Sequence, residues 1–320
     1  NIIFSLIAIT FSYLLAKELL SKKAATALAL ILTFSPSFLF YSRVGMHVIF
    51  LRTVFATGIF YFFYKWYKSK NWLYFYLGSF WTGLGITTRL ELAWIPITAF
   101  LYVIIFKRDL IKKFLFKTPG WIHLLIIPVF FVLGLMPLIL FNIATKLGTF
   151  GRIFENAATT VYGHENLNFL NNLVTRFKNL ITILDGGSFW EIGARYHNYL
   201  MPIAFFGSLL LMSALIIKNK VQREEREKFI AIVFFIIVML ALSTFSITGA
   251  SNPMHLLVLI PLPYLLILMA LDKIPSKKLF LLILVILLAS DIYVDTLYYK
   301  KLNETQGVSV FSSRINELTD

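Results

Sequence analysis

The sequence predicts an all-α polytopic membrane protein of about ten transmembrane helices, with one large outer loop that carries an amphipathic helix. Composition is the first reason, because 58% of the 320 residues are hydrophobic and only 14% are charged. Soluble domains are about half apolar and a quarter charged. In addition, apolar stretches of spanning length recur along the chain, and lysine-rich turns separate alternate pairs of them.

The predicted spans are apolar stretches close to the roughly 20 residues, with a range of about 17–25, that a membrane-crossing helix needs. They are residues 1–19, 24–41, 48–64, 72–88, 92–106, 120–144, 199–217, 229–247, 255–271 and 279–298. The span at 92–106 is short and could extend back through Glu91.

The distribution of basic residues predicts the orientation. The connections "KELLSKK", "KWYKSK", "KRDLIKKFLFK", "KNKVQREEREK" and "DKIPSKK" hold most of the 30 lysines and arginines. Short basic loops face the cytoplasm, so the opposite connections and both ends of the chain are expected outside. We therefore expect a multi-pass protein of the plasma (inner) membrane, in which any site formed by the opposite connections is periplasmic or extracellular. This bias also explains the net charge of +14 without a nucleic-acid partner.

The large outer loop is predicted at residues 146–198. Within it, apolar residues recur at three- and four-residue steps from Leu167 to Leu184, a pattern typical of an amphipathic helix. The "DGG" at 185–187 ends this helix, which we expect to lie along the outer membrane surface. A loop of this length with its own helix is usually functional.

Three basic side chains stand at the outer edge of the third predicted span. If a helix begins near Ser42, then Arg43, His47 and Arg52 lie on one side of it. Such a stripe suits the phosphate or pyrophosphate of a lipid, and Arg89 could add to it from the next outer turn. Snorkelling or solvation also explains Arg43. Arg52 lies deeper in the span, where a charge normally faces a cavity or a partner.

The last span carries Asp291 and Asp295 four residues apart. They could neutralise the arginines, bind a divalent metal or form a structural ion pair. The sequence indicates no other cofactor and no metal centre, and its lack of cysteines excludes disulfides and thiolate ligands. Hydrolase and nucleotide-binding motifs such as HExxH, GxSxG and GxxxxGK[ST] are missing as well. The "GLG" at 83–85 lies inside a span and indicates helix packing.

Three segments resemble the C-type membrane glycosyltransferases, which include the protein O-mannosyltransferases and the aminoarabinose transferases of lipid A. The first is "FSLIAITFSYLLAKELLSKKAATALALILTFSPSFLFYSRVGMHVIFLR", with matches at Leu15–Lys17, Leu19, Leu20, Ala27–Pro36 and Tyr41–Arg43. The second is "WLYFYLGSFWTGLGITTRLELAWIPI", with Arg89 at the basic position. The third is "NPMHLLVLIPLPYLLIL", with Met254 and His255 where the family often has Arg-Tyr.

The resemblance implies an enzyme that transfers a hexose or pentose from a polyprenyl-phosphate donor to a lipid, glycan or protein acceptor on the outer face. It implies a donor phosphate site, for which the sequence offers Arg43, His47, Arg52, Arg89 and His255. A catalytic carboxylate is expected in the first outer loop, which would precede Asn1. We therefore expect residues 1–320 to be a single glycosyltransferase-like domain without its first span and first outer loop. Within the chain, Glu91, Glu165 and Asp185 are the carboxylate candidates.

Two other functions fit the same features. A multi-span transporter or lipid flippase would also contain intramembrane cations, although no broken helices or repeated halves are evident. A noncatalytic relative would fit the missing carboxylate. The partners expected on the leading hypothesis are the lipid-linked donor, the acceptor and membrane lipids.

Overall fold

The computed structural model describes residues 2–43, 50–109, 120–149, 151, 168–189, 192–244 and 252–307. Every regular element in these ranges is a helix, which confirms the predicted all-α class. The chain divides into two compact units. The first contains Asn1–Phe50, Lys178–Phe229 and Pro261–Asp320, and the second contains Leu51–Phe177 and Ile230–Ile260. The single-domain organisation stays a prediction.

Four helices among the described residues are long and apolar enough to cross a membrane: Ile2–Leu19, Trp121–Ala144, Leu200–Ile217 and Lys277–Thr305. The number rises to five if Pro253–Leu259 and Leu262–Leu271 form one span. Ten spans therefore stay a prediction. One predicted span, 24–41, is interrupted at Ser35, where Pro36 begins a new helix. Proline favours such a first helical position because its missing N–H has no partner to lose there.

The first unit is built around α2 (Lys22–Phe34) and α13 (Leu262–Leu271), which contact each other. α2 also packs against α1 (Ile2–Leu19), α3 (Pro36–Tyr41) and α14 (Lys277–Thr305), while α11 (Leu200–Ile217) packs against α13 and α14. All residues of α13 are buried. Because protein covers α13 on every side, α13 forms the centre of this unit.

Three basic turns meet at one end of the first unit. The Ser21 hydroxyl donates a hydrogen bond of 2.7 Å to Asp272, which also pairs with Lys23 at 3.3 Å. Lys273 forms an ion pair with Glu225. The turns "KELLSKK", "KNKVQREEREK" and "DKIPSKK" thus share one end, as the predicted alternation of spans requires.

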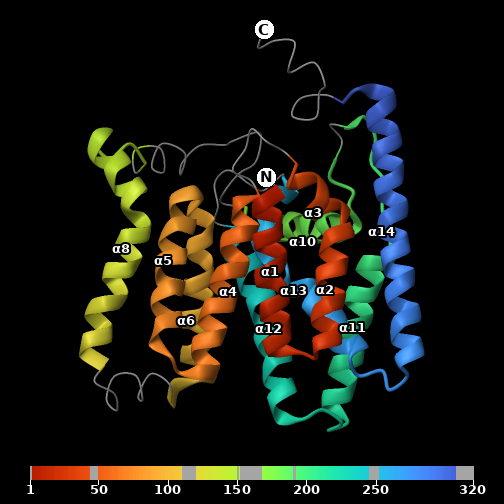
Figure 1. Ribbon diagram of the computed structural model, residues 1–320, viewed down its shortest axis with the longest axis horizontal. Coiled ribbons are helices and arrows are strands. Elements are labelled where there is room, and N and C mark those ends of the chain that lie inside the picture. The colour runs from red at the N-terminus through yellow and green to blue at the C-terminus, as the bar shows by residue number, and fades with distance from the viewer. Residues whose placement is uncertain are drawn as a thin grey trace. The chain divides into compact units, whose positions relative to one another are not determined.

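The second unit contains α4 (Leu51–Ser69), α5 (Trp72–Thr88), η1 (Leu90–Ala93), α6 (Trp94–Phe106), α8 (Gly120–Ala144) and η3 (Pro253–Leu259). α5 packs between α4 and α8 (Figure 1). Its contact with α8 is close, because a Cβ atom added to Gly83 would lie 2.3 Å from the carbonyl oxygen of Phe131 and 2.9 Å from Cα of Gly134. The "GLG" segment is therefore a helix-packing site, as predicted.

Two helices cross the division between the units, namely α10 (Phe169–Asp185) and α12 (Arg223–Ser243). α10 confirms the amphipathic helix predicted between Leu167 and Leu184. It ends at Gly186, whose φ of +75° is the left-handed conformation that glycine adopts readily after a helix.

Candidate functional site

Arg52 is anchored inside the second unit. It is the second residue of α4, and its side chain has no solvent exposure. Its Nη1 donates to the backbone oxygen of Met254 at 3.0 Å, and its Nε lies 3.3 Å from Oε2 of Glu91. A buried guanidinium requires a counter-charge to offset the loss of hydration. Glu91 supplies that charge, so the deep arginine has a partner, as its position in the sequence predicted.

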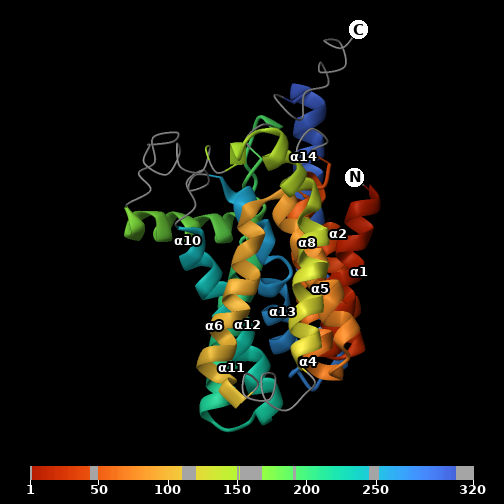
Figure 2. The same ribbon diagram turned by 90° about the vertical axis from the view of Figure 1, so that its left-hand side faces the viewer.

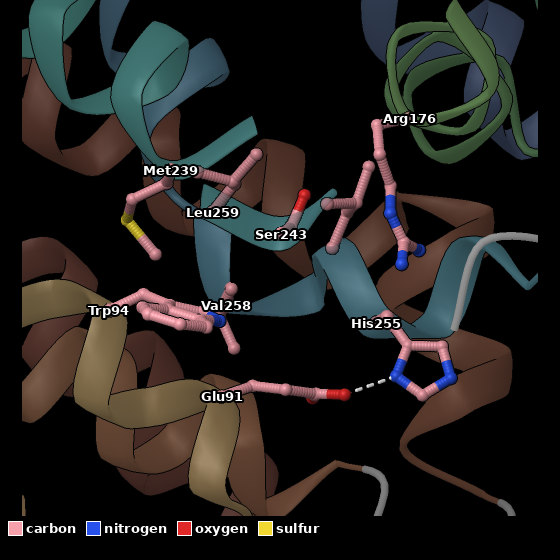
Figure 3. Close-up of a pocket in the computed structure, with 9 residues that line it drawn as sticks. Glu91, Trp94, Arg176, Met239, Ser243, His255, Val258 and Leu259 are labelled. Atoms are coloured by element: carbon pink, nitrogen blue, oxygen red, sulfur yellow. Dashed lines mark hydrogen bonds and ion pairs between the residues drawn. The ribbon is translucent and has the colours of Figure 1, made fainter. Parts of the chain in front are cut away.

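Glu91 also binds His255. The Glu91 side chain comes from η1 and the His255 side chain from η3, and Oε1 of Glu91 is hydrogen-bonded to Nδ1 of His255 (Figure 3). A carboxylate only accepts hydrogen bonds, so Nδ1 carries the proton. The second ring nitrogen, Nε2, points away from Glu91 (Figure 3) and has no hydrogen bond to a described residue. Glu91 thereby sets both the tautomer and the orientation of His255.

The charges around Glu91 keep it ionised. Burial raises the pKa of this carboxyl, but the hydrogen bond from His255 and the positive charges of Arg52, His255 and Arg89 lower it more, so the pKa lies below the ordinary 4.5. Glu91 is therefore a carboxylate at neutral pH and a weak base.

A small pocket lies beside this cluster in the second unit. Its lining includes Glu91, Trp94, Arg176, Ser243 and His255 (Figure 3). The cavity volume is about 10 Å³, close to the minimum that one water molecule requires. A phosphate group would therefore contact the edge of the cluster rather than enter this pocket as it stands.

Arg176 is the pocket residue that the sequence did not single out. It comes from α10, has no solvent exposure, and its pKa is lowered by burial to about 10. It remains protonated at neutral pH. A single arginine in an amphipathic helix ordinarily lies on or beside the solvated face, so its residue type alone gave no reason to select it. Its complete burial, which only the structure shows, distinguishes Arg176 from an ordinary surface arginine.

The predicted phosphate-binding residues are only partly brought together. Arg52 and His255 share the Glu91 cluster, and Arg89, half-buried at the end of α5, contributes charge to it. The Nε atom of Arg89 is buried and has no hydrogen bond within the described ranges. Arg43 lies in the other unit and is exposed, and His47 lies outside the described residues.

The expected helix from Ser42 through Arg52 was wrong at the positions the structure describes. α3 ends at Tyr41, Ser42 and Arg43 form a turn, and α4 begins only at Leu51. The argument that placed a basic stripe on one side of a single helix therefore fails. Arg52 is held by tertiary contacts with Met254 and Glu91 instead.

The other carboxylate candidates lie elsewhere. Asp185 belongs to the first unit, where Oδ2 is 2.9 Å from Nδ1 of His197 and Oδ1 accepts the N–H of Gly187 at 2.7 Å. Burial raises the pKa of Asp185, against the opposing effects of Gly187 and His197. The His197 side chain is one-third exposed. Glu165 lies outside the described residues.

Asp291 and Asp295 are buried on α14 of the first unit. Asp291 accepts a hydrogen bond of 2.6 Å from Asn198, and neither aspartate forms an ion pair with a described residue. Across the described ranges, no three metal-ligating side chains come together. A metal role or an arginine partner for these aspartates stays a hypothesis.

Part of the chain is similar to a known protein family. Residues 1–133 match the family model of dolichyl-phosphate-mannose-protein mannosyltransferases. The resemblance to the C-type membrane glycosyltransferases is thereby confirmed over this part of the chain. No curated protein and no solved structure matches.

The matched segment contains Arg52, Arg89 and Glu91, whereas Arg176 and His255 follow it in the sequence. The chain thus combines a segment similar to a mannosyltransferase family with apolar helices of spanning length.

Proposed function

We propose that the chain is a membrane glycosyltransferase that moves a sugar from a polyprenyl-phosphate donor to a lipid, glycan or protein hydroxyl on the outer face. The observation that carries this proposal is the match of residues 1–133 to the family of dolichyl-phosphate-mannose-protein mannosyltransferases. The same segment supplies the buried Arg52–Glu91 pair and Arg89. These residues provide the charge that a phosphate-leaving reaction needs.

In this reaction the bond between the anomeric carbon and the phosphate oxygen breaks, and the acceptor oxygen forms a new bond to that carbon. The acceptor proton passes to a base, and the polyprenyl phosphate leaves with the bonding electron pair. Negative charge therefore grows on the phosphate, where preorganised cations lower the barrier. The sugar leaves as part of the product, so the atoms and charges balance without a redox partner.

For the donor phosphate we propose Arg89 as the direct contact, because its side chain is only half-buried. Arg52 is fully buried against Glu91. We therefore propose that Arg52 is a positioning residue, which orients Glu91 and, through Glu91, the imidazole of His255. Nε2 of His255 is then directed away from the carboxylate and can donate to or accept from a ligand. Arg43 and His47 stay proposed as further outer cations.

Glu91 and Asp185 suit different roles. Glu91 is held by two cationic or proton-donating partners, and its lowered pKa makes it a weak base. The pKa of Asp185 is raised by burial, and Asp185 contacts the part-exposed His197. Of these two candidates, Asp185 is therefore the stronger base, and it keeps its place as a proposed proton acceptor within the first unit, with His197 beside it. Glu165 keeps its place as a third candidate.

The test is transfer by the purified protein, reconstituted in lipid nanodiscs with radiolabelled polyprenyl-phosphate hexoses and pentoses. Arg89→Ala should lower the rate by about 10- to 100-fold if this cation stabilises the leaving phosphate. The matched control is Arg223→Ala, because Arg223 is 93% exposed and pairs only with Glu227 within its own helix turn among the described residues. This control should transfer at the wild-type rate.

The outcomes separate the alternatives. Transfer by the wild-type protein that Arg89→Ala leaves unchanged would overturn the phosphate role but keep the enzyme. Transbilayer movement of a lipid in vesicles without any glycosyl transfer would identify a flippase. No transfer from any such donor and no lipid movement would point to the noncatalytic relative.

A further inference from the structure

The first half of α10, up to Phe177, exposes apolar side chains and buries polar ones, the reverse of a surface helix in a soluble protein, whereas its second half buries Leu180 and Leu184. Leu170, Val174 and Phe177 are 74%, 52% and 45% exposed, whereas Asn172 and Arg176 are 3% and 0% exposed. A soluble protein would bury the first group and expose the second. The environment outside α10 must therefore favour apolar side chains.

The exposed apolar residues form one continuous stripe. Leu170, Val174 and Phe177 follow each other at steps of four and three residues, which place them on one side of a helix with 3.6 residues per turn. Lys178 is exposed at the edge of this stripe. A helix with an apolar face and a cation at its border has the composition of a helix bound at a membrane surface.

The direction of the helix agrees with this location. The Phe169–Phe177 part of α10 belongs to the second unit, together with α5 and α6. In that unit it runs across the direction of α5 and α6 (Figure 2). If those helices cross the bilayer, α10 lies close to the plane of the interface.

We propose that the Leu170–Val174–Phe177 stripe of α10 is seated in the interfacial layer of the lipid bilayer. In the same unit, α8 is long and apolar enough to span a membrane, and it exposes Leu125 and Val129 by 64% and 55%, as a helix in contact with lipid would. A bilayer edge therefore lies within reach of the same unit. Lipid covers the stripe without requiring another protein.

This placement has a consequence for the pocket. Val174 and Arg176 are two residues apart, so one helical turn presents Val174 to lipid and Arg176 to the Glu91–His255 pocket. Because the helix backbone is rigid, lipid contact along the stripe fixes the Cα position from which the Arg176 side chain reaches the pocket. On this proposal, contact of α10 with the bilayer helps to position Arg176 at the pocket.

Site-directed spin labelling tests the proposal directly, because the chain contains no cysteine. Val174→Cys and Leu170→Cys are labelled in the full-length protein in phosphatidylcholine–phosphatidylglycerol nanodiscs. Their accessibilities to oxygen and to a water-soluble nickel chelate are then compared. The control on the same helix is Asn171→Cys, which is exposed but lies about 60° from Val174. Leu125→Cys and Arg223→Cys serve as the lipid and water references.

We expect the oxygen-to-nickel accessibility ratio at positions 170 and 174 to exceed that at 171 several-fold and to approach that at 125. A ratio equal to the water reference at 223 would overturn the proposal. Protection from both reagents, with spin–spin broadening between copies, would assign the stripe to a second copy and also overturn it. Phe177→Cys repeats the measurement, so that one perturbed position does not decide the result.

Discussion

Nδ1 of His255 is hydrogen-bonded to Oε1 of Glu91, although the two residues are 164 positions apart in the sequence. The contact joins η1 to η3 inside one compact unit, and it places a buried carboxylate between an imidazole and the guanidinium of Arg52. Glu91 is therefore the negative charge that balances the positive charge of Arg52 and fixes the proton of His255.

Replacement of Glu91 by glutamine should destabilise the protein strongly. Glu91→Gln leaves the fully buried Arg52 without its counter-charge, and breaking a buried pair in this way costs about 3–5 kcal/mol. Thermal unfolding in a mild detergent should show a lower midpoint. The matched control is Glu304→Gln, since Glu304 is half-exposed and its pair with Lys301 is worth ~0.5 kcal/mol or less. An equal midpoint for wild type and Glu91→Gln would contradict a structural role for the pair.

Acidification should weaken the same cluster. The folded-state pKa of Glu91 lies below its ordinary 4.5, so its contribution to stability is complete above that pH and is lost as the pH falls through the folded-state pKa. The wild-type unfolding midpoint should therefore drop on acidification below pH 4.5. The midpoint of Glu91→Gln should fall less over the same range, because glutamine does not titrate. Parallel curves for both proteins would show that other groups dominate the acid response.

The close contact between α5 and α8 should not tolerate an added methyl group. Gly83→Ala would place Cβ 2.3 Å from a backbone oxygen of α8, and such overpacking costs about 1–3 kcal/mol. Gly207→Ala on α11 is the matched control, because no atom lies within 4 Å of the new Cβ. That change should be neutral or stabilise by up to ~1 kcal/mol, since alanine favours a helix over glycine. Unfolding midpoints that rank the two variants the other way would refute this packing.

Removal of the Arg176 charge should lower the transfer rate more than removal of the Lys178 charge on the same helix. If the proposed transferase uses the pocket, Arg176→Gln should reduce transfer by about 10-fold or more, because it removes a protonated group beside Glu91 and His255. Lys178→Gln changes the same net charge on the same helix at an exposed position and should leave the rate unchanged. The measurement is the nanodisc transfer assay, with the unfolding midpoint of each variant recorded first. Equal rates for both variants would remove Arg176 from the site.

The sequence by itself determined the helical class, the basic turns and the amphipathic helix of residues 169–185, because each depends on local hydrophobic period, charge or capping. It also identified Gly83 as a packing residue and Arg52 as a buried cation that requires a partner. Each of these properties follows from residues close together in the chain.

Only the tertiary structure decided which residues meet. Whether Arg52 pairs with Glu91, Asp291 or a phosphate depends on which helices are neighbours, and the spacing within one helix carries no such information. The burial of Arg176 could not be inferred either, because the helical period shows two faces but not which side chains other helices cover. The end of α3 at Tyr41 and the assignment of Arg43 and Arg52 to different units are likewise features that the apolar pattern does not reveal.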